Sequence, residues 1–191
     1  MATAILISPI QLYSLIAVRR IRLHYGIPAQ DLAIGIGKSI NYIGTMENEQ
    51  TEGGYNDTVL TEIAQYISTK IKDYPESELE IKGKTDYTIY DFYPTEILSD
   101  EKVIKKIDPI PPGSGPTGTL NALIESTNFF KTARTLNEIV TKANKVQNQN
   151  WEASNFTQPL ENAVKGKNKR LEVVLKDGLN TYILAKKRKK D

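Results

Sequence analysis

Apolar side chains return at helical spacing through the first third of the chain. Between Leu12 and Leu23 they lie close to one helical stripe, which predicts a helix that begins at about Leu12. Gly26 is expected to end this helix, and Pro28 suits the first turn of a second one, from Ala29 to about Ile34. The pattern therefore indicates one longer helix, a tight turn and a second, shorter helix.

A glycine-containing stretch then separates two further helices. Gly35-Ile36-Gly37 is expected to break the second helix, and a third is predicted from Ser39 to Glu47. A fourth is predicted from Asp57 to about Ile67, where apolar residues again recur at helical spacing. Residues 1–69 are therefore predicted to form one compact all-α domain.

The helical pattern is lost in the middle of the chain, at residues 70–116. Leu79–Lys82 and Tyr87–Tyr93 alternate polar with apolar or aromatic side chains, which is typical of strands, and Val103–Ile107 fits a short strand or a helical turn. Prolines and glycines at 109–116 indicate a hinge. Two interpretations stay open: an extended connector, or a tyrosine-rich strand that contributes to a homodimer.

The last third of the chain again has helical spacing. Thr117 or Thr119 is expected to cap a first helix that ends near Phe130, and Thr135 to cap a second. A third helix is predicted to end at Val164 and to begin at Ser154 or Thr157, with Thr157 as the better cap because Pro159 must lie in the first turn.

A β-hairpin is predicted after these helices. The β-rich runs Arg170–Leu175 and Asn180–Leu184 flank an Asp-Gly pair, which is the strongest short hairpin signal. The predicted fold class is thus mainly α with a small β component. The predicted domains are residues 1–69, a connector of residues 70–116, and residues 117–191.

Charge divides unevenly along the chain. Residues 1–67 hold four basic and six acidic side chains, residues 68–115 seven and ten, and residues 116–191 fourteen and seven, so the net charges are −2, −3 and +7. A basic C-terminal third suits a polyanionic partner such as nucleic acid.

The residue types present argue against several chemistries. The 191 residues include no cysteine and one histidine, His24, which excludes disulfide scaffolds, thiol nucleophiles and cysteine-ligated metals. No phosphate-binding loop or metal-ligand motif is present, so we expect a protein that is not an enzyme and needs no cofactor. The apolar start is interrupted by polar residues and has no preceding basic residues, so we expect a cytoplasmic protein without a membrane segment.

The N-terminal domain resembles the helix-turn-helix domain of phage repressors of the Cro type, over roughly residues 12–69. The matching residues are spread over the expected helices: Val18 to Arg22, Leu32-Ala33, Gly37, Ile43, Met46-Glu47-Asn48 and Leu60 to Ile67. The small Ala33 suits the crossing of two helices, and Gly37 suits the positive φ of the turn between them. The family often pairs a glutamate at the position of Glu47 with an arginine of the first helix, here Arg19 or Arg22.

This resemblance implies a DNA-reading surface around the third helix. The residues expected to face DNA are Lys38, Ser39, Ile40, Asn41, Tyr42 and Thr45. Asn41 has the donor and acceptor that read adenine, and Ile40 has the apolar surface to meet a thymine methyl. Because the domain is net negative, a second interpretation stays open, in which the fold serves dimerisation or protein contact.

The C-terminal domain resembles a winged helix-turn-helix, over about residues 117–186. The resemblance rests on Phe129-Phe130, the run from Thr132 to Ile139, the next helix and the hairpin. In that family the third helix enters the major groove and the hairpin lies against the flanking DNA backbone. The implied DNA-contacting residues are Ser154, Asn155, Thr157, Gln158, Glu161, Asn162 and Lys165 on the helix, then Lys167, Lys169 and Arg170, Lys176 at the hairpin tip, and the basic tail Lys186 to Lys190.

Charge and resemblance together predict a sequence-specific protein that binds double-stranded DNA, namely a transcriptional regulator that forms a homodimer. The alternative is a protein-interaction adaptor or an antitoxin-like factor, in which the helix-turn-helix folds serve assembly with a protein partner.

Overall fold

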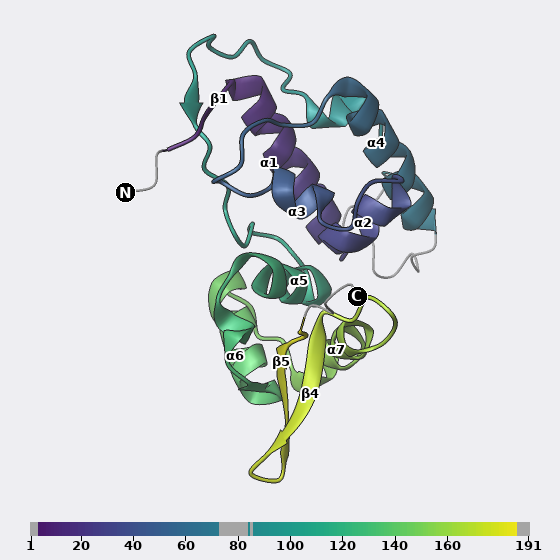
Figure 1. Cartoon of the computed structure of the whole chain (residues 1–191), viewed down its shortest axis with the longest axis vertical. Helices are drawn as coiled ribbons and strands as arrows, with labels where there is room; N and C mark the ends of the chain where they lie inside the picture. The colour runs from purple at the N-terminus through teal and green to yellow at the C-terminus, as the bar shows by residue number, and fades with distance from the viewer. Residues whose placement is uncertain (1–3, 73–83, 85, 187–191) are drawn as a thin grey trace. The chain divides into compact units, whose positions relative to one another are not determined.

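The chain folds into two compact units, residues 1–108 and 109–191. The computed structural model describes residues 4–72, 84 and 86–186 (Figure 1). These residues are mainly α-helical and include two small antiparallel sheets, which confirms the predicted fold class at that level. Within these residues, no helix combines the length and the apolar character that crossing a membrane requires.

The first helix, α1, spans Pro9–His24 and begins three residues before the predicted start at Leu12. Ser8 is its N-cap, with a side chain that accepts a hydrogen bond from the backbone N–H of Gln11, and Pro9 occupies the first helical position. Serine followed by proline is a favourable helix start because the cap supplies an acceptor and proline needs no donor partner. The strand before it, β1, spans Leu6–Ile7.

The region predicted as a helix-turn-helix contains a shorter third helix than expected. Helix α2 spans Ala29–Gly35, and Gly37 has the predicted positive φ, at 69°. Helix α3 spans only Tyr42–Met46, so the prediction of a helix starting at Ser39 was wrong. The chain turns instead through 38–41, where the Tyr42 N–H donates to the Ser39 carbonyl over 2.8 Å.

The fourth helix begins where the sequence predicted. Helix α4 spans Asp57–Lys72, and the side chain of Asn56 accepts a hydrogen bond from the Val59 N–H over 2.9 Å. Its inward residues complete one core with α1, α2 and α3. The buried side chains of that core include Leu15, Val18, Leu32, Ile43, Leu60, Ile63 and Ile67.

The segment predicted as a connector belongs in part to the first unit. Tyr87–Tyr93 does not form the predicted strand: Ile89–Phe92 is a 3-10 helix, η2, and Phe92 is fully buried in the core of the unit. Strand β2, Val103–Ile104, pairs antiparallel with β1. The predicted strand Leu79–Lys82 lies outside the described residues. The structure therefore divides the chain after Asp108, whereas the sequence suggested boundaries near residues 69 and 116.

The second unit starts with a helix whose cap differs from the prediction. Helix α5 spans Pro116–Ser126, and its N-cap is Gly115 rather than Thr117 or Thr119. The chain continues through a 3-10 helix, η3, at Phe129–Lys131 and a short strand, β3, at Arg134–Thr135.

The next helix of this unit is capped as the sequence predicted. Helix α6 spans Leu136–Gln147. Thr135 is its N-cap, and the side chains of Thr135 and Glu138 bond to each other's backbone N–H groups, which is a capping box. Helix α6 therefore begins at a position that the sequence itself encodes.

The last helix and the hairpin follow. A 3-10 helix, η4 (Ala153–Phe156), precedes α7 (Thr157–Val164), so Thr157 is the first helical residue and Phe156 its N-cap, contrary to the predicted Thr157 cap. Strands β4 (Leu171–Lys176) and β5 (Leu179–Leu184) form the predicted hairpin. Its two turn residues, Asp177 and Gly178, both have the positive φ of a tight hairpin turn.

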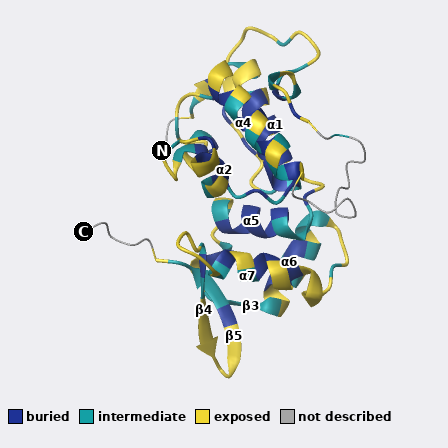
Figure 2. Ribbon diagram, turned by 90° about the vertical axis from the view of Figure 1, so that its right-hand side faces the viewer, coloured by how far each residue is buried: buried dark blue, intermediate teal, exposed yellow. Residues whose placement is uncertain are grey.

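The hairpin is one part of a three-stranded sheet in the order β3-β5-β4. Because β3 precedes α6, this pairing joins the start of α6 to the hairpin. The core between the sheet and the helices contains Leu120, Phe130, Ile139, Phe156, Leu160 and Leu171. Figure 2 shows the buried inner faces of α5, α6 and α7 and the exposed far half of the hairpin.

Candidate nucleic-acid interfaces

A buried ion cluster holds the end of α3 against α1. Glu47 directly follows α3, and its carboxylate accepts from Arg19 Nη1, from Arg22 Nε over 2.6 Å and from Arg22 Nη2 over 2.5 Å. The predicted glutamate–arginine pair is thus present with both candidate arginines. Burial raises the pKa of Glu47, but the two guanidiniums outweigh this, so that its pKa lies below the ordinary value.

A second buried cation fixes the loop that follows α3. The ammonium of Lys105 donates to the carbonyl oxygens of Met46 (2.7 Å), Thr51 (2.8 Å) and Gly53 (3.3 Å), and Lys105 is only 2% exposed. Burial lowers the pKa of this lysine. The segment from α3 to α4 is therefore held at Glu47 by two arginines, and at Met46, Thr51 and Gly53 by Lys105.

The residues predicted to face DNA in the first unit surround this segment. Ser39, Ile40, Asn41 and Thr45 are exposed and Tyr42 is half-buried, but only Tyr42 and Thr45 lie on α3. Lys38 forms an ion pair with Glu62, with 3.1 Å between Nζ and Oε2, which partly neutralises the one lysine of the set.

Cations are scarce on this surface of the first unit. Arg19 and Arg22 are taken up by the buried cluster, while Glu52 is exposed in the following loop. The described surface around α3 is therefore rich in hydrogen-bonding groups and poor in the positive charge that phosphate contacts require.

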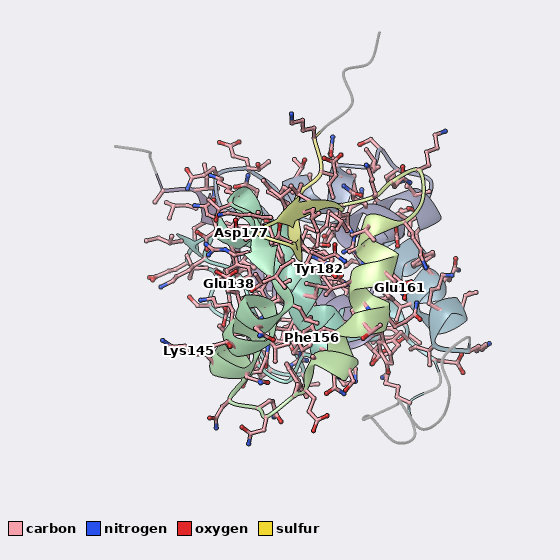
Figure 3. All side chains as sticks on the ribbon, turned by 90° about the horizontal axis from the view of Figure 1, so that it is seen from below. Glu138, Lys145, Phe156, Glu161, Asp177 and Tyr182 are labelled. Carbon is pink, nitrogen blue, oxygen red and sulfur yellow. The ribbon has the colours of Figure 1, made fainter. Side chains whose placement is uncertain are left out.

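Helix α7 of the second unit presents a polar face. Thr157, Gln158 and Asn162 are exposed on α7 and Lys165 is exposed at its C-cap, whereas Leu160 and Ala163 point into the core. The amide of Gln158 donates to the side-chain oxygen of Asn162 over 2.9 Å, which orients the two amides one helical turn apart. Figure 3 shows Glu161 on α7 and Phe156 between α6 and α7.

Two other predicted residues near α7 have structural partners. The Asn155 side chain accepts from the backbone N–H of Glu152 over 2.8 Å, so it caps η4. Lys165 bonds to Glu161 over 2.6 Å, in an exposed pair one turn apart that leaves the ammonium on the surface. Ser154 lies exposed within η4.

The basic residues beyond α7 differ in whether another side chain of the fold binds them. Arg170 donates to the side-chain oxygen of Asn121 on α5 over 2.6 Å, which gives it a structural role, and Lys169 bonds to Glu172 over 3.0 Å. Lys167 and Lys176 are exposed and form no ion pair with any described residue. Of the predicted basic tail, Lys186 is exposed and residues 187–190 lie outside the described part.

Several of these contacts were not predicted from the sequence. Lys105 lies in the run Val103–Ile107, for which the sequence predicts a short strand or a helical turn, and Arg170 was predicted to contact DNA. Each meets its partner only through tertiary structure. Thr88 and Asp91, in contrast, have the spacing of a capping box, and that signal indicates a helical turn in place of the predicted strand.

The described residues offer no group of three or more acidic or histidine side chains that could hold a metal ion. No protein-family model, curated protein or solved structure matches the chain.

Proposed function

We propose that the second unit binds double-stranded DNA, with α7 as the helix that enters the major groove. The observation that carries the proposal is the exposed polar face of α7, formed by Thr157, Gln158 and Asn162 and followed by exposed Lys165 and Lys167. Side-chain amides read base edges, and lysines meet the phosphates on either side.

The order of elements in the second unit supports this assignment. Three helices are followed by a two-stranded hairpin, and the short β3 pairs with β5, as suits a winged helix-turn-helix. Helix α7 is the third helix of this order. The unit as defined by the structure carries fourteen basic and seven acidic side chains, a net charge of +7, so its field attracts DNA.

The first unit contributes less to DNA affinity in this proposal. Residues 1–108 carry eleven basic and sixteen acidic side chains, a net charge of −5, and Arg19, Arg22 and Lys105 are buried. The exposed Asn41 and Thr45 therefore have little positive charge near them to add phosphate contacts.

The test is selection of bound duplexes from a random pool by the full chain. One enriched motif is expected, and Gln158→Ala or Asn162→Ala should change the preferred base at one position, with a loss of about 1–3 kcal/mol for a bidentate contact. Thr141→Ala, on the exposed face of α6, is the matched control and should leave the motif unchanged. Recovery without enrichment would contradict sequence-specific binding.

A second candidate function is protein binding by the first unit. The outer face of α1 carries Ile10, Tyr13 and Ile16, which are 45%, 37% and 42% exposed. Ile97, near the N-terminal end of α1, is fully exposed. Apolar side chains gathered in this way are typical of protein-interaction surfaces. The double variant Ile10→Lys/Ile16→Lys should then abolish binding of the protein partner and leave the DNA motif that the chain selects unchanged.

A further inference from the structure

Strand β4 is an edge strand with open hydrogen-bonding groups. It pairs with β5 on one side and has no neighbour on the other among the described residues. The Val174 carbonyl faces β5, where it accepts from the Thr181 hydroxyl over 2.6 Å. Because backbone groups alternate along a strand, the N–H and C=O groups of Val173 and Leu175 point away from the sheet.

The side chains of this edge are apolar and exposed. Val173, Val174 and Leu175 are 46%, 44% and 71% exposed, and the hairpin extends beyond the helices of its unit (Figures 1 and 2). Edge strands are normally protected by a charge, a proline or a bulge within the strand. Here the charges stand only at the two ends of the run, at Glu172 and Lys176.

The sequence of β4 is complementary to itself in one antiparallel register. A two-fold axis perpendicular to the sheet, midway between Val174 of one copy and Val174 of a second, places Glu172 opposite Lys176 of the second copy and Lys176 opposite its Glu172. On the other face, Val173 then meets Leu175 of the second copy. The outward backbone groups of Val173 and Leu175 are the ones that bond in this register.

The neighbouring registers lack this complementarity. An axis through Val173 places Lys176 opposite Arg170 of the second copy, which repels, and Glu172 opposite a valine. An axis at Leu175 places Lys176 opposite Val174 of the second copy and Glu172 opposite its turn residue Gly178. Like charges directly opposite each other destabilise a strand pair, and opposite charges stabilise it.

We infer that β4 pairs antiparallel with β4 of a second copy of this chain, about a two-fold axis at Val174. The result is a continuous six-stranded sheet in the order β3-β5-β4-β4-β5-β3. The interface is the same patch on both copies, which closes the assembly at a dimer. In this pairing Lys176 forms an ion pair with the second copy and does not contact a DNA phosphate.

The inference differs from the sequence-based expectation of a dimer through the tyrosine-rich middle. Tyr87 and Phe92 from that segment are buried in the core of the first unit, whereas Tyr90 is exposed. The inference does not rest on DNA binding, because the dimer is measured without nucleic acid, so either proposal can fail alone.

A charge-swap series on the full chain tests the register by sedimentation velocity across concentrations. Glu172→Lys and Lys176→Glu each convert two attractive contacts into two repulsive ones, so each should weaken dimerisation at least about tenfold. The double variant Glu172→Lys/Lys176→Glu restores both contacts between the copies but removes the Lys169–Glu172 ion pair within each copy, so it should dimerise more tightly than either single variant. An equal mixture of the two single variants should form a mixed dimer for the same reason.

The fold of every variant is checked through Trp151, which packs against the core of the second unit and is the sole tryptophan of the chain. A wild-type chain that stays monomeric up to its solubility limit would overturn the inference. A dimer insensitive to both single variants would also overturn it, as would open-ended assemblies in place of dimers.

Discussion

Replacing Glu47 by glutamine should strongly destabilise the first unit. The Glu47 side chain is 3% exposed, and the side chains of Arg19 and Arg22 are 4% and 0% exposed. Glutamine leaves two buried guanidiniums without an opposing charge, and breaking a buried ion pair in this way costs about 3–5 kcal/mol. This is a large part of the roughly 5–15 kcal/mol that stabilises a domain. At about 4–8 °C per kcal/mol, the melting temperature of the unit should fall by on the order of 20 °C.

The assay follows thermal unfolding of the full chain by two signals. Far-ultraviolet circular dichroism reports on both units, whereas fluorescence of Trp151 reports on the second unit alone, since no other tryptophan exists. Glu47→Gln should melt early by circular dichroism with little change in the fluorescence transition. Glu52→Gln removes the same charge from an exposed position and should shift stability by no more than about 0.5 kcal/mol.

The same variant has a pH signature. The pKa of Glu47 is lowered in the folded state, so its stabilising contribution is present above the ordinary value of 4.5 and is lost as the pH falls through the lowered folded pKa. The stability difference between wild type and Glu47→Gln should therefore narrow below about pH 4.5. A loss under about 1 kcal/mol at neutral pH, or a difference that widens in acid, would refute the role of this cluster.

Three further changes test other parts of the fold. Lys105→Met leaves three carbonyl oxygens without their buried donor, so we expect a loss on the order of 3 kcal/mol in urea unfolding of the first unit, whereas exposed Lys106→Met should change little. Thr135→Ala removes the capping box of α6 and should cost about 1 kcal/mol by Trp151 fluorescence, against no change for Thr141→Ala. Gly178→Ala forces a side chain onto a φ of 76° and should cost about 1–2 kcal/mol by the same signal.

Local sequence signals predicted the elements whose ends are set by single residues. Gly37, Thr135 and the Asp177-Gly178 pair each satisfy a backbone requirement within a few residues of themselves. The start of α4 at Asp57 and the hairpin strands were predicted for the same reason. Such signals act before any tertiary contact forms, so the sequence alone reveals them.

Elements decided by tertiary packing were predicted less well. Tyr87–Tyr93 alternates like a strand, but burial of Phe92 and the Thr88–Asp91 capping box favour a 3-10 helix. Of the helix predicted from Ser39 to Glu47, only Tyr42–Met46 is helical. The residues before it continue the turn that begins at Gly37. The pairing of β3 with β5 involves only two residues of each strand, which is too short to give a strand pattern in the sequence.

The candidate site was predictable in part for the same reason. Exposed polar residues of α7 follow from helical spacing, and Gln158 and Asn162 lie on the surface that spacing predicts. The partners of Arg170 and Lys38 are distant in the sequence, so only the structure reveals these contacts. Lys165 instead pairs with its neighbour Glu161 one turn away and stays exposed, and Lys167 is exposed.

The most direct test of DNA binding by the second unit is fluorescence anisotropy of a labelled duplex against salt concentration. Wild-type affinity should fall linearly on logarithmic axes, with a slope of about −0.9 per phosphate contacted. Lys165→Gln/Lys167→Gln should flatten the slope by up to about 1.8, at about 0.9 for each lost contact. Lys102→Gln/Lys106→Gln removes the same charge from exposed positions in the first unit and should leave the slope unchanged. Equal slopes for the two variants, or no binding at low salt, would contradict the assignment of α7 and its flanking lysines as the DNA-binding surface.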